Sequence, residues 1–137
     1  MRVIFTLILL LSVLNLQNVF AENLNTPDNK EVVSMIQSQN IAFEDCTKMF
    51  AVNKEKLFYL TLAAVNANRF AIEEIQTSNG YIIFTAANNK YLATIAGIDA
   101  NNSILKITPC NDIYFFPPGV ILGIFKYVGM NINTEIK

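Results

Sequence analysis

The sequence predicts a small α+β domain made of a central helix, a four-stranded antiparallel meander and a C-terminal helix. Three observations predict this fold class: a capped segment with helical periodicity over residues 54–68, short β-prone runs between turn residues over 70–109, and a strongly apolar run over 119–130. A chain of 137 residues can bury one substantial core but not two. We therefore place a single domain at residues 51–137.

The N-terminus has the three parts of a secretory signal peptide. Arg2 supplies a positive charge, residues 3–16 form an apolar core, and residues 19–21 end in Ala21, a small residue suited to cleavage. The apolar core is shorter than the ~20 residues that a membrane-spanning helix needs, which favours a signal peptide over residues 1–21 against a membrane anchor. We expect an exported protein, either periplasmic or secreted.

Residues 22–50 are interpreted as a mobile leader. Residues 22–30 are polar, and the spacing of Val32, Met35 and Ile36 is compatible with a short helix over residues 31–37. Residues 41–51 form either an extended segment or a loop that leads to the central helix.

The central helix is expected to begin at about Lys54, because Asn53 is a natural N-cap and Glu55 suits the positive end of the helix dipole. Its apolar arc covers roughly 220°, about twice the stripe of a surface helix. One sheet face cannot cover that arc, so we expect a second helix to pack against it. The arc consists of Leu57, Phe58, Leu60, Thr61, Leu62, Ala64 and Val65.

Four β-prone runs follow, at residues 70–76, 81–86, 91–98 and 104–108. Asn79-Gly80 between the first two is a strong hairpin signal, and only antiparallel neighbours can be joined by such short turns. We expect a meander in the order 1-2-3-4. Glu73 and Glu74 would point to opposite faces of the first strand, a conflict that a bulge or an edge position would relieve.

The C-terminal apolar run is expected to form the second helix. Pro117-Pro118 sets a break before it, and a helix over residues 119–130 reaches only ~18 Å. That length is well short of the ~30 Å hydrocarbon core, so we expect no membrane-spanning segment in the mature chain.

The link Asn68-Arg69-Phe70, the strand at 72–75, the turn Ser78-Asn79-Gly80 and the strand at 81–84 resemble small bacterial envelope α+β domains similar to those of BamC, a lipoprotein of outer-membrane β-barrel assembly. The link commonly reads Gly-Tyr in such domains, and this chain has Arg69-Phe70. The rest of the chain is similar to uncharacterised exported proteins of bacteria, a resemblance from which no activity follows.

Composition argues against several function classes. The chain has no histidine, the usual general base and the commonest metal ligand, and its net charge of −1 gives no basic footprint for nucleic acid. Glu73 and Glu74 on opposite faces would not converge on one substrate. We therefore expect no enzyme activity, no catalytic residues, no cofactor and no metal site.

Cys46 and Cys110 are the only cysteines. In an oxidising compartment they can form a disulfide, which the loop-closure model values at about 4 kcal/mol. The alternative is two independent buried thiols.

A C-terminal aromatic and aliphatic cluster is the candidate partner or ligand surface. Its side chains either fill the core or remain partly exposed and bind a protein partner, a second copy or an acyl chain. We expect an exported, non-enzymatic binding or assembly module that acts through protein–protein contacts; the alternative is a carrier of a lipid or other apolar ligand between the sheet and the C-terminal helix. The cluster consists of Phe115, Phe116, Ile121, Leu122, Ile124, Phe125 and Tyr127.

Overall fold

The computed structural model describes residues 27–135, so the expected signal peptide at residues 1–21 lies outside the described part of the chain. The chain divides into two compact units, with the boundary after Ile36. The first contains α2 (Pro27–Ile36), a helix that includes most of the short helix expected at residues 31–37 but begins earlier. The second unit, from Gln37 onwards, contains all the other elements of the described residues.

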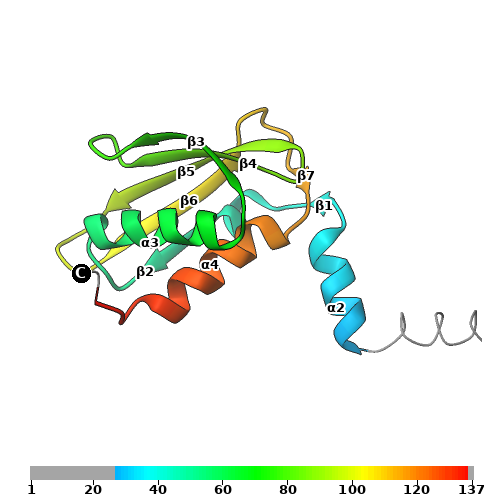
Figure 1. Ribbon diagram of the computed structural model, residues 1–137, viewed down its shortest axis with the longest axis horizontal. Helices are drawn as coiled ribbons and strands as arrows, with labels where there is room; N and C mark the ends of the chain where they lie inside the picture. Colours follow the sequence, from blue (N-terminus) through cyan, green and yellow to red (C-terminus); the bar gives the residue numbers. More distant parts are fainter. Residues whose placement is uncertain (1–26, 136–137) are drawn as a thin grey trace, which may run out of the picture. The chain divides into compact units, whose positions relative to one another are not determined.

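The second unit is built on a five-stranded antiparallel sheet with the strand order β2-β6-β5-β4-β3 (Figure 1). Four consecutive strands, β3 to β6, form the predicted meander, and the α+β fold class is confirmed. The strands are β2 (Thr47–Phe50), β3 (Ala71–Gln76), β4 (Tyr81–Ala86), β5 (Asn89–Gly97) and β6 (Ser103–Pro109).

The sequence did not predict strand β2. It follows a 3₁₀ helix, η1 (Phe43–Cys46), and pairs with the outer edge of β6, where Thr47 lies opposite Lys106 and Phe50 opposite Ser103. Cys46 and Phe50 are buried in the core. The sheet unit therefore includes residues 37–50, which the sequence analysis assigned to the leader.

Helix α3 (Lys54–Ala67) is the predicted central helix and begins at the expected residue. The Lys56 amide donates a hydrogen bond of 2.8 Å to Asn53 Oδ1, which satisfies one of the free amides of the first turn. Every member of the predicted apolar arc is buried except Leu62, which is half-buried. The wide arc is therefore covered on more than one side.

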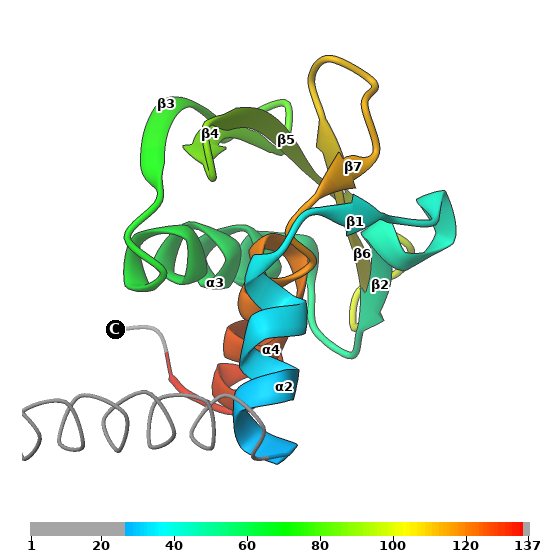
Figure 2. The same cartoon turned by 90° about the vertical axis from the view of Figure 1, so that its right-hand side faces the viewer.

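Helix α4 (Gly119–Asn131) is the second partner that α3 requires. Figure 1 shows α3 and α4 side by side under the sheet, and Figure 2 shows both on the same face of it. Ile124 and Val128 of α4 are fully buried. The helices approach closely at Gly123, where a Cβ atom would lie 2.7 Å from Asn68 Oδ1, so a larger residue there would displace the Asn68 side chain.

Strand β3 accommodates Glu73 and Glu74 in both of the ways expected, by an edge position and by a bulge. Strand β3 lies at the edge of the sheet, and its register with β4 shifts between Ile72 and Glu74, which marks a bulge at Glu73. The expectation that the two carboxylates point to opposite faces is wrong. Because the bulge inserts Glu73 as an extra residue in β3, Glu73 and Glu74 both lie on the face of the sheet away from the helices. There Glu73 accepts a hydrogen bond from Thr85, and Glu74 accepts one from Tyr81.

A second, two-stranded sheet joins β1 (Gln39–Asn40) to β7 (Phe115–Phe116). Gln39 lies opposite Phe116 and Asn40 opposite Phe115. The Ile41 amide extends the pairing by donating a hydrogen bond of 2.8 Å to the Tyr114 carbonyl. This sheet ties the start of the unit to the segment that enters α4.

Among the described residues, none of the helices has the length and apolarity to traverse a lipid bilayer.

Replacing Asn53 with alanine is expected to lower the free energy of unfolding by about 1 kcal/mol, because the Lys56 amide loses its acceptor. Chemical denaturation measures this loss. Asn66, an exposed residue of the last turn of α3, gives the control: Asn66→Ala should change stability by less than about 0.5 kcal/mol. Equal effects of the two substitutions would contradict the capping role.

Candidate functional site

The C-terminal cluster that the sequence singled out divides between the core and the surface. Phe116, Ile121, Ile124 and Phe125 are buried, and Tyr127 is half-buried. Two members remain exposed: Phe115 by 55% and Leu122 by 44%. Most of the cluster therefore fills the core, and only Phe115 and Leu122 are left as substantially exposed apolar side chains.

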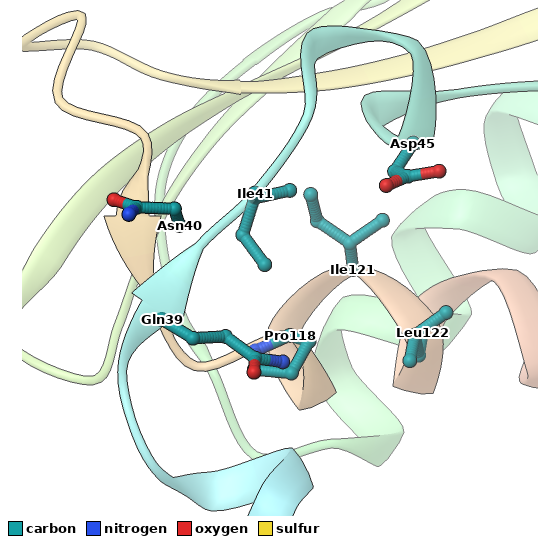
Figure 3. A pocket seen from close by; sticks show the side chains of 7 residues that line it. All are labelled: Gln39, Asn40, Ile41, Asp45, Pro118, Ile121 and Leu122. Atoms are coloured by element: carbon teal, nitrogen blue, oxygen red, sulfur yellow. The ribbon is translucent and has the colours of Figure 1, made fainter.

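A surface hollow of about 370 Å³ lies beside Leu122 (Figure 3). We call it the α4 hollow. It is formed by β1, η1 and the first turn of α4, three elements that are brought together by the β1–β7 pairing. Its lining consists of Gln39, Asn40, Ile41, Asp45, Pro118, Ile121 and Leu122.

The walls of the α4 hollow combine apolar and polar side chains. In Figure 3, Ile41 and Ile121 point toward one another, Gln39 lies against Pro118, and the Asn40 side chain points away from the group. Pro118 is the N-cap of α4 and, with Pro117, turns the chain from β7 into the helix. The two prolines therefore place Ile121 and Leu122 beside the 39–41 segment.

Polar groups form the rim of the hollow. Gln39 and Asp45 are exposed, and no lysine or arginine of the described chain forms an ion pair with Asp45. The rim therefore offers a carboxylate and a side-chain amide to a group that enters the hollow.

The Cys46 thiol lies behind this rim. It is fully buried and donates a hydrogen bond of 3.6 Å to the Ala42 carbonyl. Burial raises the pKa of Cys46, and the carboxylates of Asp45 and Glu44 raise it further. The thiol therefore stays protonated and is a core group without nucleophilic character.

The candidate disulfide does not form in the structure: Cys46 and Cys110 are both free, the first buried and the second exposed. Partial burial also raises the pKa of Cys110, although the nearby Lys90 ammonium opposes this. The two thiols are independent, as in the alternative, but the expectation that both are buried is wrong for Cys110. Thr47, which follows Cys46, lies opposite Lys106 on β6, whereas Cys110 lies beyond the end of that strand at Pro109, so the two cysteines are offset along the strand direction.

Thiol labelling is expected to distinguish the two cysteines. In the native protein a maleimide should modify Cys110 within minutes and leave Cys46 unmodified, whereas both should react after denaturation without reductant. Intact mass measurement counts the adducts. A native protein that takes up no label, and whose denatured form requires reductant to react, would contain the disulfide and contradict the structure.

The second surface of interest is the face of the five-stranded sheet that points away from α3 and α4, which we call the open face (Figure 2). Its side chains alternate with the buried ones along β4, β5 and β6. Met49 on β2 is 60% exposed, and the others are half-buried by their neighbours. The apolar members are Met49, Tyr81, Ile83, Leu92 and Ile104.

The charged groups of the open face have separate partners. Glu73 forms an ion pair of 2.5 Å with Lys90 and accepts a hydrogen bond from Thr85, and these contacts lower the pKa of Glu73. The Tyr81 hydroxyl donates a hydrogen bond of 2.7 Å to Glu74 Oε1, which raises the pKa of Tyr81. The two carboxylates lie on one face but are engaged in different contacts, an arrangement typical of a structural role.

Within residues 27–135, no three histidine, cysteine, aspartate or glutamate side chains gather into a group that could hold a metal ion.

The sequence identified Ile121 and Leu122 of the α4 hollow but not Gln39, Ile41 and Asp45. Their only local signal was the apolar run Ile41-Ala42-Phe43 after the polar residues 37–40. No protein-family model, curated protein or solved structure matches this chain.

Proposed function

We propose that this protein is an exported, non-enzymatic binding module that acts through contacts with a partner protein at the α4 hollow. The observation that carries the proposal is the hollow of about 370 Å³, lined by both apolar and polar side chains and including the exposed Leu122. Export is proposed from the signal-like residues 1–21.

The hollow suits an apolar anchor side chain of a partner. The half-buried Ile41 and the exposed Leu122 present apolar surface to water, and its removal from water on binding is favourable. Interfaces commonly depend on such a central apolar anchor, surrounded by polar contacts that exclude water. Phe115, on the strand opposite Asn40, adds a second exposed apolar side chain nearby.

The rim suggests the chemistry beside that anchor. Asp45 has no cationic partner within the described chain, so a lysine, an arginine or a backbone amide of the partner would satisfy its carboxylate. Gln39 can both donate and accept a hydrogen bond. The proposed target is therefore an apolar side chain flanked by a hydrogen-bond donor.

Protein binding is favoured over the carrier of an apolar ligand. Such a carrier would need free space between the sheet and α4, but Phe116, Ile124 and Phe125, which would line that space, are buried. Phe50 and Phe125 meet edge to face across it, with ring centroids 6.2 Å apart. The hollow lies instead at the surface, where its exposed rim suits a protein contact.

The test compares capture from an envelope extract by the unaltered protein and two variants. Leu122→Asp places a charge beside the hollow, whereas Met130→Asp places the same charge on an exposed position of α4 outside its lining. We expect capture of the partner to fall at least about tenfold for Leu122→Asp and to stay unchanged for Met130→Asp.

Thermal unfolding of both variants checks that they fold. A partner retained equally by all three proteins would contradict the proposed site, and the absence of any partner specific to the unaltered protein would count against the function.

A further inference from the structure

We propose that Asn101 is an N-glycosylation site, and that its glycan is attached while the exported chain is still unfolded. The donor is an oligosaccharide carried on a polyprenyl diphosphate lipid. The inference rests on the export proposed above, but not on binding at the α4 hollow. Three observations carry it: the sequence Asn101-Asn102-Ser103, the exposure of Asn101 and the unpartnered hydroxyl of the buried Ser103.

Residues 101–103 match the acceptor pattern for N-glycosylation, an asparagine followed two positions later by serine or threonine, with no proline between them. Asn101 is the only asparagine of the sequence that meets this pattern. The pattern is short and occurs by chance in many proteins, so its meaning depends on where the fold places its residues.

Asn101 lies in the turn that joins β5 to β6, drawn in yellow in Figure 1. Residues 98–101 are all exposed. The Asp99 carboxylate accepts a hydrogen bond of 2.7 Å from the Asn101 backbone amide and bonds of 2.9 and 3.0 Å from Asn102 Nδ2. The Asn101 side chain itself makes no hydrogen bond within residues 27–135. Its Nδ2 atom is therefore free to carry a sugar.

Ser103 is the part of the motif that the folded structure does not explain. Its side chain is fully buried, and its hydroxyl has no hydrogen-bond partner in the described chain. Burial of a hydroxyl without a partner lowers stability, and alanine would fill nearly the same space without that cost. A serine at this position is therefore unfavourable for folding, but the acceptor pattern requires its hydroxyl.

The position of Ser103 also indicates when the transfer occurs. Ser103 begins β6 and pairs with Phe50 of β2 on one side and with Gly97 of β5 on the other. In the folded protein its hydroxyl and backbone are thus inaccessible to an enzyme that must bind them. A chain exported through a signal such as residues 1–21 crosses the membrane unfolded, and the segment is accessible at that stage. Transfer therefore precedes the incorporation of β6 into the sheet.

The transfer needs no oxidant or reductant. Asn101 Nδ2 attacks the anomeric carbon of the sugar, and the new N–C bond replaces the bond from that carbon to the diphosphate oxygen. The polyprenyl diphosphate leaves with the electron pair, and a base of the transferase takes the proton lost by Nδ2. This chain supplies only the acceptor nitrogen and the Ser103 hydroxyl.

A glycan on Asn101 is compatible with the folded unit. Because Phe50 lies opposite Ser103, the turn is at the end of the sheet where β2 ends, whereas the α4 hollow is built on η1, before β2 begins. The glycan is therefore attached away from the hollow. It also adds polar surface beside Ile98, an apolar side chain of the same turn that is 52% exposed.

Mass spectrometry of the full chain, purified from the exported fraction of its natural source, tests the proposal. Trypsin cuts after Lys90 and Lys106, so the site lies in peptide 91–106. We expect this peptide to carry a glycan in most molecules, and fragmentation should place the glycan on Asn101.

Four variants produced in the same source test the acceptor pattern. Asn101→Gln, which changes only an exposed side chain, and Ser103→Ala should each abolish the mass increase, whereas Ser103→Thr should retain it. Asn102→Gln is the matched control: it changes the adjacent amide but leaves the pattern intact, so the glycan should remain.

The order of transfer and folding is tested with membranes of the source, which hold the lipid-linked donor. They should modify a synthetic peptide of residues 97–107 at least about tenfold faster than the folded, unmodified full chain, because the folded state opens at Ser103 only rarely. In chemical denaturation without the glycan, Ser103→Ala should unfold at a midpoint no lower than that of the unaltered chain.

An exported chain that has lost residues 1–21 but carries no glycan on Asn101 overturns the inference and leaves export intact. A chain that retains residues 1–21 and is unmodified overturns export as well. Modification that persists in Ser103→Ala, or equal rates for the peptide and the folded chain, also overturns the inference. Binding at the hollow is decided separately by capture with Leu122→Asp.

Discussion

Replacement of Phe84 by alanine is expected to lower the free energy of unfolding by about 3–5 kcal/mol, measured by chemical denaturation. Phe84 is fully buried at the middle of an aromatic stack. Its ring lies 5.7 Å from that of Phe70 and 5.5 Å from that of Tyr91, in stacked arrangements, and Tyr91 meets Phe116 edge to face at 5.2 Å. Removal of the ring leaves a cavity and breaks two of these contacts.

Phe115→Ala is the matched control, because it removes the same side chain from a position that is 55% exposed. Its effect on the free energy of unfolding should be within about 0.5 kcal/mol. A loss of less than about 1 kcal/mol for Phe84→Ala would mean that the stack does not hold the sheet to β7, and the described core would be incorrect.

Replacement of Ile124 by alanine is the second large expected effect, a loss of about 2–5 kcal/mol in the free energy of unfolding. Ile124 is fully buried on α4, and Leu57, Ala64 and Val65 of α3 are equally inaccessible to water. Calorimetry should also show a single transition for the unaltered protein, because α4 completes the core that α3 needs.

Met130→Ala on the same helix gives the comparison for this second effect. Met130 is 73% exposed, and its truncation should cost less than about 0.5 kcal/mol. If α4 did not pack on α3, Ile124→Ala and Met130→Ala would both change the free energy of unfolding only slightly. Part of the apolar face of α3 would then be exposed to water.

Much of the fold could be predicted because its signals are local. The Asn53 cap fixes the start of α3, and the apolar arc of α3 is too wide for one sheet face, which implies α4. Gly80 has a φ of 71°, a conformation that glycine adopts readily, and its turn joins β3 to β4 as expected. Short turns between alternating runs then leave few topologies other than a meander.

Strand β2 was missed because its information is not local. Its four residues are too few to establish a periodicity, and its partner β6 lies more than fifty residues later in the chain. Burial of Phe50 against Phe125 stabilises it, and that contact depends on the whole α3 and α4 arrangement. The position of Glu73 was misjudged for a related reason: strict alternation fails wherever a bulge consumes one residue.

The candidate site was only half predictable. Helical spacing in α4 could not show which side chains face α3 and which remain exposed, because the run is apolar almost all round. Only the structure separates the buried Ile124 from the exposed Leu122. The hollow also needs Ile41 and Asp45, which the two-residue pairing of β1 with β7 brings to α4 from a distant part of the sequence.

The kinked outer strand β3 has a consequence for how the protein behaves when it is concentrated. Fibril growth requires each arriving chain to find a straight, uncharged row of free amides and carbonyls, and the displacement at Glu73 together with the adjacent Glu74 interrupts that row. Polymers of indefinite length are thereby disfavoured at this end of the sheet.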